Sequence, residues 1–172
     1  MNLDLFADSS SIVHRPSLEA VLKRFQEWMA HPNSPVRTIR HLPPQPARFV
    51  EIPSHADARL VQALESRGIR SLYSHQGDAF TSASAGRNVV VVTPTASGKT
   101  LCYNLPVLNR IAADPGARAF YLFPTKALAQ DQMEELYQLI QLSGKDIKTF
   151  TYDGDTPQDA RRAIRSQGHV VV

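Results

Sequence analysis

The length, composition and charge of the sequence limit the classes of protein to which it can belong. Its 172 residues suit one domain, or one domain with an arm, and a content of 42% hydrophobic and 20% charged residues is ordinary for a globular protein. The net charge of +3 excludes a broad basic field that would by itself indicate nucleic-acid binding, so any such contact must come from local placement of cations.

The single cysteine and the opening residues bear on the cellular compartment. Cys102 has no second cysteine with which to form an internal disulfide, and we expect it to be a small buried residue. Residues 1–8 carry acids where a signal peptide carries bases, and no long apolar run follows them. We therefore expect a cytoplasmic protein.

The first third of the chain is predicted to be a helix followed by a proline-rich arm. Ser17 is a suitable N-cap, and apolar residues then recur at helical spacing, which predicts a helix over about 17–30. Six prolines within residues 31–53 disfavour regular helix and favour extended backbone. We predict an N-terminal extension over 1–52 and a separate, incomplete α/β domain over 53–172.

A second helix and a short polar segment precede the central motif. The helix is expected at about 56–67, with Gly68 as its stop. Tyr73 and Gln76 follow it: a glutamine amide can both donate to and accept from the N6 and N7 edge of adenine, and a tyrosine ring can stack on the base. Taken alone, this pair is more typical of packing at a helix start, so the adenine interpretation depends on the motif that comes next.

The stretch 88–100 organises the rest of the chain. Four valines run into a polar loop that ends in Gly98-Lys99-Thr100, which predicts a buried parallel strand at 88–92, a phosphate-binding loop and a helix. In such a loop the helix N-terminus holds an anion, Lys99 contacts the outer phosphates and the Thr100 hydroxyl ligates Mg²⁺. The candidate nucleotide-binding residues here are Thr95, Ala96, Ser97, Gly98, Lys99 and Thr100. Thr93 stands where the full G-x-x-x-x-G-K-[ST] pattern has glycine, so the match is partial.

Three further strands are expected after the helix that follows Thr100, a helix that Pro106 should kink or divide. The strand at 119–123 ends in Pro124-Thr125-Lys126 before a second helix, and the strand at 147–152 ends in Asp153-Gly154-Asp155-Thr156. Thr156 is predicted to cap the next helix, with Pro157 at its first position. That helix carries Arg161, Arg162 and Arg165, which are expected to form a solvated face, and residues 169–172 begin a fourth strand.

The order of these elements predicts the fold and the place of the site. Strand, loop and helix repeat, and such right-handed crossovers generate a parallel sheet with helices on both faces, which is an α/β, RecA-like P-loop architecture. Because every loop described above follows the C-terminal end of a strand, all of them share one edge of the sheet, where open α/β sheets bind ligands.

Four segments, 73–76, 95–100, 124–132 and 152–156, together resemble the first RecA-like domain of DEAD/DEAH-box superfamily 2 helicases, most closely the bacterial DNA helicases of the YprA, MrfA and Hrq1 type. The resemblance implies binding of ATP and Mg²⁺, binding of single-stranded or duplex nucleic acid, DNA in preference, and ATP-driven 3′-to-5′ movement in repair near the nucleoid. It makes Lys99 and Thr100 catalytic and gives adenine contact to Tyr73 and Gln76. The nucleic-acid contacts that it implies are Pro124, Thr125, Lys126, Gly154 and Thr156.

The resemblance also implies that parts of the motor lie outside this sequence. The family's Asp-Glu-x-His segment and its second RecA-like domain are absent, so we expect an N-terminal fragment that binds ATP weakly, hydrolyses it poorly and does not unwind a duplex. Three alternatives stay open at this point. They are a complete small P-loop NTPase with Asp153 as its acid, another superfamily 2 motor such as an RNA helicase or restriction-type translocase, and a non-catalytic nucleic-acid-binding module.

Overall fold

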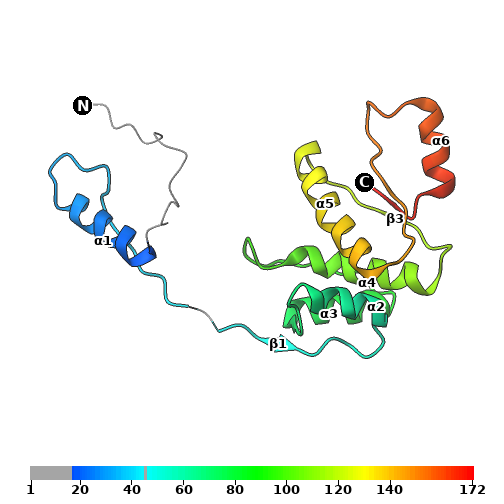
Figure 1. Cartoon of the computed structure of the whole chain (residues 1–172), viewed down its shortest axis with the longest axis horizontal. Coiled ribbons are helices and arrows are strands. Elements are labelled where there is room, and N and C mark those ends of the chain that lie inside the picture. Colours follow the sequence, from blue (N-terminus) through cyan, green and yellow to red (C-terminus); the bar gives the residue numbers. More distant parts are fainter. Residues whose placement is uncertain (1–16, 45) are drawn as a thin grey trace, which may run out of the picture. The chain divides into compact units, whose positions relative to one another are not determined.

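The computed structural model describes residues 17–44 and 46–172 (Figure 1). The opening segment 1–8, which was considered above for a signal peptide, lies outside these residues. The chain divides into two compact units, Met1–Gln45 and Pro46–Val172, and each is described by itself.

In the first unit, the main element is the helix α1 (Leu18–Met29). Ser17 caps it, because its hydroxyl accepts a hydrogen bond of 3.3 Å from the Ala20 N–H, so the helix predicted over 17–30 is confirmed. None of the α1 side chains is buried. Among the described residues, the aromatic and cation–π partners of the Trp28 ring are two neighbours on the same helix, Phe25, which it meets edge-on, and Arg24. Residues 30–44 form no helix or strand, as the prolines predict.

The second unit opens with a pair of short strands and two helices. β1 (Phe49–Val50) pairs antiparallel with β2 (Leu72–Tyr73), so the strand at 49–50 lies in this unit. Between the two strands, α2 (Ala58–Ser66) is followed by Gly68 with a φ of +79°, a left-handed conformation that suits glycine at the end of a helix. α3 (Ser74–Ser84) begins directly after β2.

Two longer helices complete the apolar core of the second unit. α4 (Lys99–Ala113) packs along α3, and α5 (Lys126–Ser143) packs against α2 (Figure 1). Cys102 on α4 is buried, as predicted, and Pro106 lies inside α4 without dividing it. The largest fully buried apolar side chains come from all four helices and from β2 and β5, and they are Leu60, Leu64, Leu72, Phe80, Leu105, Leu108, Leu136, Leu139 and Val170.

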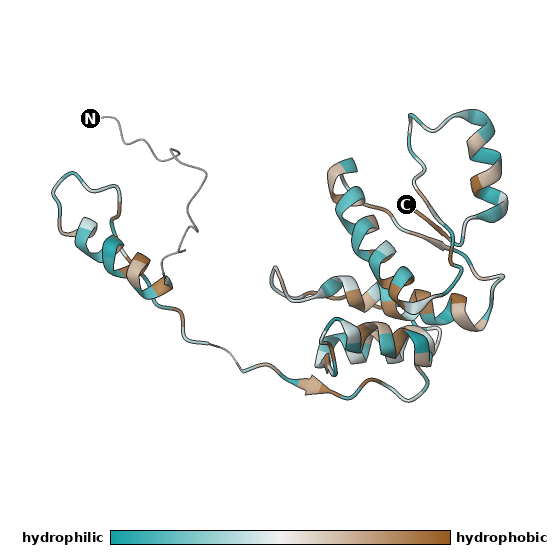
Figure 2. Cartoon of the chain, viewed as in Figure 1, coloured by the Kyte–Doolittle hydropathy of each residue, from teal (hydrophilic) through white to brown (hydrophobic). Residues whose placement is uncertain are grey.

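A small parallel sheet lies at the C-terminal end of the described chain. β5 (Val170–Val171) is its central strand, with β3 (Ala119–Phe120) on one side and β4 (Thr149–Phe150) on the other. α6 (Gln158–Gln167) connects β4 to β5; it is largely hydrophilic and buries only Ile164 (Figure 2). The predicted parallel α/β architecture is therefore confirmed, and the segment 169–172 is a strand as expected.

The strand predicted at 88–92 is wrong for this structure. Its backbone has no ladder partner among residues 46–172, and the side chains of Val90 and Val92 are each 88% exposed. A run of β-branched residues has the propensity for a strand, but a strand also requires a neighbour that accepts and donates its backbone hydrogen bonds. The four valines therefore form an extended segment that leads into the loop.

The cap predicted at Thr156 is also wrong. Pro157 is the N-cap of α6, so the first helical residue is Gln158, and no side chain caps the helix. The hydroxyl of Thr156 instead accepts a 2.9 Å hydrogen bond from the Asp153 N–H. The Thr156 hydroxyl therefore bonds within the turn 153–156 and does not accept from an N–H group of α6. A threonine side chain can bond to the backbone of its own turn in this way.

Candidate nucleotide and nucleic-acid site

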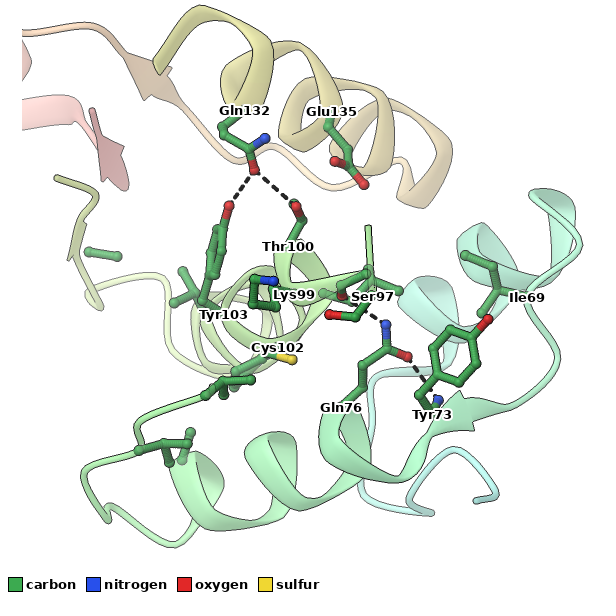
Figure 3. Close-up of a pocket in the computed structure, with 18 of the residues that line it drawn as sticks. Ile69, Tyr73, Gln76, Ser97, Lys99, Thr100, Cys102, Tyr103, Gln132 and Glu135 are labelled. Carbon is green, nitrogen blue, oxygen red and sulfur yellow. Dashed lines mark hydrogen bonds between the residues drawn. The ribbon is translucent and has the colours of Figure 1, made fainter. Parts of the chain in front are cut away.

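The predicted phosphate loop lines an open cleft of about 1750 Å³ in the second unit. The starts of α3 and α4 form one wall, and α5 contributes side chains from the opposite side (Figure 3). All the residues assigned to nucleotide binding from the sequence line this cleft, and they are Tyr73, Gln76, Thr95, Ala96, Ser97, Gly98, Lys99 and Thr100.

Gly98 shapes the end of the loop. Its φ of +72° is left-handed, and a Cβ at this position would lie 2.6 Å from Nε2 of Gln76, so both the backbone and the space require glycine. Gly98 is also the N-cap of α4 and brings no side chain to cap the helix. The N–H groups of the first turn are therefore directed at the cleft without a side-chain acceptor, which suits an anion.

Gln76 braces the loop against the start of α3. Its side chain is only 4% exposed; Oε1 accepts a 2.9 Å hydrogen bond from the Tyr73 N–H, and Nε2 donates a 2.8 Å bond to the Gly98 carbonyl. A carboxamide has two donors and two lone pairs, so one donor and one lone pair are not used by these bonds. The sequence left two interpretations of Gln76, packing at a helix start and adenine contact; the structure shows the first, since the amide bonds to the N-cap residue of α3 and braces the loop.

His75 is a second support that the sequence reasoning missed. Its Nε2 lies 2.9 Å from the Ser97 carbonyl oxygen, to which the ring N–H donates. The His75 ring also stacks on Tyr73, with 5.7 Å between centroids, and Tyr73 in turn stacks on Phe49 at 5.0 Å. Tyr73 is thus held in a row of aromatic rings at the cleft, and the residue spacing alone contains no signal for such a row.

Lys99 is held by the loop itself. Its ammonium donates to the carbonyl oxygens of Thr93 at 3.0 Å and Pro94 at 2.7 Å. Thr93, which replaces the glycine of the full motif, also shares a 2.6 Å hydrogen bond between its hydroxyl and that of Ser97. A phosphate oxygen can displace the neutral carbonyls, because hydrogen bonds between charged partners are roughly twice as strong as neutral ones.

Thr100 meets α5 rather than the loop. Its hydroxyl donates a 3.0 Å hydrogen bond to Oε1 of Gln132, and the Tyr103 hydroxyl donates to the same oxygen (Figure 3). The described residues contain no group of three or more His, Cys, Asp or Glu side chains that could hold a metal alone. One hard hydroxyl oxygen beside an anion site fits Mg²⁺, which takes most of its ligands from phosphates and water.

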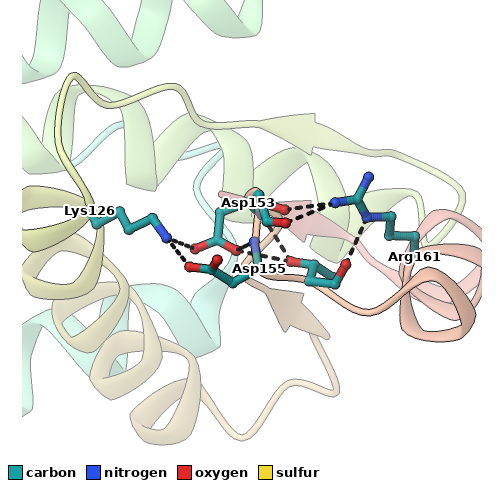
Figure 4. Close-up of polar contacts among 6 residues, drawn as sticks. Lys126, Asp153, Asp155 and Arg161 are labelled. Atoms are coloured by element: carbon teal, nitrogen blue, oxygen red, sulfur yellow. Dashed lines mark hydrogen bonds and ion pairs between the residues drawn. The ribbon is translucent and has the colours of Figure 1, made fainter.

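The two loops assigned to nucleic acid are joined to each other. Thr125 caps α5, with its hydroxyl accepting from the Leu128 N–H at 3.2 Å, and Lys126 begins the helix. The Lys126 ammonium pairs with the carboxylates of Asp155 and Asp153, the latter at 3.0 Å (Figure 4). Hydrogen bonds to Asp155 and Asp153 raise the pKa of Lys126, and the bond from Lys126 lowers the pKa of Asp153.

Arg161 holds the turn that contains Gly154 and Thr156. Its guanidinium donates to the carbonyl oxygens of Thr156 at 2.8 Å, Asp153 at 3.2 Å and Gly154 at 3.3 Å (Figure 4). It also lies 5.2 Å from the centroid of the aromatic ring of Tyr152. The solvated face predicted for the arginines of α6 is therefore wrong for this residue, which is half-buried on the turn, whereas Arg162 and Arg165 are exposed as predicted.

Comparison with known proteins identifies the family. Residues 73–172 match the family described as DEAD/DEAH box helicase. The chain belongs to the DEAD/DEAH box helicases. It is 52% identical over 140 residues to the ATP-dependent helicase YprA of Bacillus subtilis, a match that covers 81% of this chain and 19% of YprA. It is 33% identical to the ATP-dependent helicase hrq1 of Schizosaccharomyces pombe, covering 90% of this chain and 15% of the relative.

Solved structures of this helicase family support the same assignment. The DUF1998 helicase MrfA bound to DNA matches at a TM-score of 0.77 and 48% identity, over 91% of this chain and 20% of the solved chain. The Mycobacterium smegmatis helicase Lhr bound to ssDNA and AMP-PNP matches at 0.61 and 28% identity, over 69% and 17%. The chain therefore spans about a fifth or less of these relatives.

None of the helices in the described ranges is long and apolar enough to span a membrane.

Proposed function

We propose that this chain carries the ATP-binding site and part of the nucleic-acid track of an ATP-dependent helicase. One observation carries the proposal: Gly98, Lys99 and Thr100 form the N-terminus of α4, and they line an open cleft where no side chain caps the helix. The extension 1–52 and the helicase domain 53–172 are proposed as the two parts of the chain, with the last residues of the extension, Phe49–Val50, paired to the second unit through β2.

Each residue of the loop has a proposed task. Lys99 exchanges its two loop carbonyls for the outer phosphates, and the first-turn N–H groups of α4 hold the remaining phosphate oxygens. The remaining loop residues, Thr95, Ala96 and Ser97, surround the phosphates with backbone. Thr100 is the proposed ligand of Mg²⁺, which when bound neutralises charge on the phosphates as they transfer. These tasks make Lys99 and Thr100 the proposed catalytic residues.

The base end of the nucleotide is proposed to lie against α3. Tyr73 supplies an aromatic face, and Gln76 has one N–H and one lone pair beyond those used in the loop brace, enough for an adenine edge after a modest side-chain movement.

The nucleic-acid track is proposed to run along the ends of β3 and β4. Thr125 and Lys126 offer a hydroxyl and a cation at the start of α5, next to Pro124, and the turn at Gly154 and Thr156 lies within reach through the Lys126 ion pairs. DNA is the proposed substrate, because MrfA and Lhr, which resemble this chain, were solved with DNA or ssDNA. The complete protein is proposed to move 3′ to 5′ on DNA and to act in repair at the nucleoid.

The test is a binding experiment on the purified chain with a fluorescent ATP analogue and Mg²⁺. We expect Lys99→Ala to abolish binding while the circular dichroism spectrum stays unchanged, and the exposed Lys148→Ala, which lies outside the cleft, to leave binding intact. Binding that persists in Lys99→Ala would refute the proposed site.

The substrate is tested in the same preparation. We expect single-stranded DNA to bind more tightly than RNA of the same sequence, and Lys126→Ala to weaken that binding. A preference for RNA would instead favour an RNA helicase of the same superfamily.

A further inference from the structure

Gln132 lies on α5 and faces α4 across the nucleotide cleft. It ends the segment 124–132, which carries part of the family resemblance, but the resemblance gave this residue no role of its own. Its Oε1 accepts two hydrogen bonds, one of 3.0 Å from the Thr100 hydroxyl and one from the Tyr103 hydroxyl (Figure 3). A carboxamide oxygen has two lone pairs, so both are occupied by hydroxyl donors from α4.

This arrangement fixes the direction of the Thr100 hydroxyl. The hydroxyl has one hydrogen and two lone pairs, and its hydrogen is committed to Gln132. Both lone pairs of Thr100 are therefore directed away from α5 and stay available to a cation. Without an acceptor at this position the hydroxyl would rotate, and some of its orientations would turn the hydrogen toward the cation.

Tyr103 helps to fix the orientation of the Gln132 amide. The Tyr103 hydroxyl donates to Oε1 from the turn of α4 that follows Thr100. Two donors meet at Oε1, so a flip of the Gln132 amide would break both bonds, and both hydroxyls would have to turn and accept from its NH₂ group instead. Tyr103 thus keeps the oxygen of Gln132 turned toward Thr100.

We propose that Gln132 is a positioning residue for Thr100, which it holds with its oxygen lone pairs presented to the divalent cation that accompanies a nucleoside triphosphate. The inference rests on the proposed function and deepens it. It adds to the cation site a residue from α5, the helix whose start is proposed to contact nucleic acid. Partners that hydrogen-bond to a metal ligand orient it, and their loss typically weakens metal binding about 10-fold to 100-fold.

The experiment is a Mg²⁺ titration of nucleotide binding by the purified chain, with a fluorescent, non-hydrolysable ATP analogue as the probe. Gln132→Met keeps the length of the side chain and removes the acceptor; it should raise the Mg²⁺ concentration at half-maximal binding about tenfold, at the lower end of the usual range because Thr100 itself is kept. Binding measured in EDTA should not change, since that state lacks the cation.

Three matched variants distinguish orientation from simple packing. Gln132→Glu keeps an acceptor oxygen and should retain a midpoint close to that of the wild type. Tyr103→Phe removes the other hydrogen bond to the same oxygen but leaves the Thr100 bond, so it should shift the midpoint much less than Gln132→Met. In a Thr100→Ala background, Gln132→Met should cause no further shift.

The outcomes separate the inference from the function on which it rests. A normal Lys99-dependent titration in the wild type together with an unchanged midpoint in Gln132→Met overturns the role of Gln132 and leaves the ATP site standing. A shift in Gln132→Glu as large as that in Gln132→Met also overturns it, because loss of the acceptor oxygen would then not be the cause. If the wild type shows no Lys99-dependent binding, the proposed function fails and the inference fails with it.

Discussion

Replacement of Gly98 by alanine tests the closest approach in the nucleotide cleft. Gly98 has a φ of +72°, and a new Cβ would lie 2.6 Å from Nε2 of Gln76, closer than real Cβ contacts. The amide of Gln76 must therefore move and give up its 2.8 Å bond to the Gly98 carbonyl. Gln76 is 4% exposed, so water does not readily replace that partner.

The expected cost follows from two terms. A left-handed backbone costs a residue with a Cβ about 1–2 kcal/mol. A buried donor left without its acceptor costs about 1–3 kcal/mol more. Gly98→Ala should thus lower the free energy of unfolding by roughly 2–5 kcal/mol. Gly144 provides the matched control, because its φ is +60° and no atom lies within 4 Å of a Cβ there, so Gly144→Ala pays only the first term.

Urea denaturation of the chain, followed by circular dichroism, measures both variants. With a denaturant slope of about 2 kcal/mol per molar, the midpoint of Gly98→Ala should fall by about 1–2.5 M, and that of Gly144→Ala by about 0.5–1 M. In a Gln76→Ala background the extra cost should disappear, since the clashing amide is gone. Equal costs for the two glycines in the wild-type background would refute the reasoning.

Three further predictions concern ion pairs and hydrogen bonds. The hydrogen bond from Lys145, at 2.7 Å, lowers the pKa of Asp57, so the unfolded chain binds more protons in acid; the stability from this pair is complete above the ordinary pKa of 3.8 and is lost as the pH falls below it. Urea unfolding between pH 2 and pH 7 should therefore show a smaller acid loss in Lys145→Gln. Asp155→Asn should tighten binding of single-stranded DNA, because it removes an anion that competes for Lys126, while Lys126→Ala should reduce the slope of log affinity against log salt by about 0.7. Arg161→Lys should lower the free energy of unfolding by about 1–2 kcal/mol in the same denaturation assay, because an ammonium cannot reproduce three guanidinium bonds to the turn.

Each of these has an outcome that contradicts it. Identical acid profiles for the wild type and Lys145→Gln would remove the role of that pair. Weaker DNA binding by Asp155→Asn would mean that the carboxylate aids binding rather than competing. For the arginine, the exposed Arg162→Lys is the control and should change stability by less than about 0.5 kcal/mol; an equal loss in both variants would contradict the prediction.

The features predicted well from the sequence are those determined by nearby residues. Ser17 caps α1, and Gly68, with a φ of +79°, follows the end of α2, because caps and left-handed stops are properties of a few consecutive residues. The parallel sheet was also predictable, since strands and helices alternate in the second half of the sequence. Its central strand at Val170–Val171 was expected from only four residues, three of them valine.

What could not be predicted depends on partners distant in the sequence. The valines at 89–92 have strand propensity, but whether they form a strand is decided by a neighbouring chain segment that no local pattern reveals. In the cleft, His75 reaches Ser97 across 22 residues and Gln132 reaches Thr100 across 32. Such contacts have no periodicity, so His75 and Gln132 were given no role from the sequence, whereas the loop itself and Gln76 were found.

The placement of Gln132 on α5 has a mechanical consequence. The same helix begins at Lys126, so the cation that faces the nucleic-acid loops and the amide that orients Thr100 are six residues apart, about 9 Å along one rigid rod at 1.5 Å per residue. A ligand that binds to the first turn of α5 and moves the helix also moves Gln132, which accepts the hydrogen bond from the Thr100 hydroxyl. Linkage is reciprocal: if nucleic acid bound at the start of α5 changes the affinity for the divalent cation at Thr100, that cation changes the affinity for nucleic acid by the same factor.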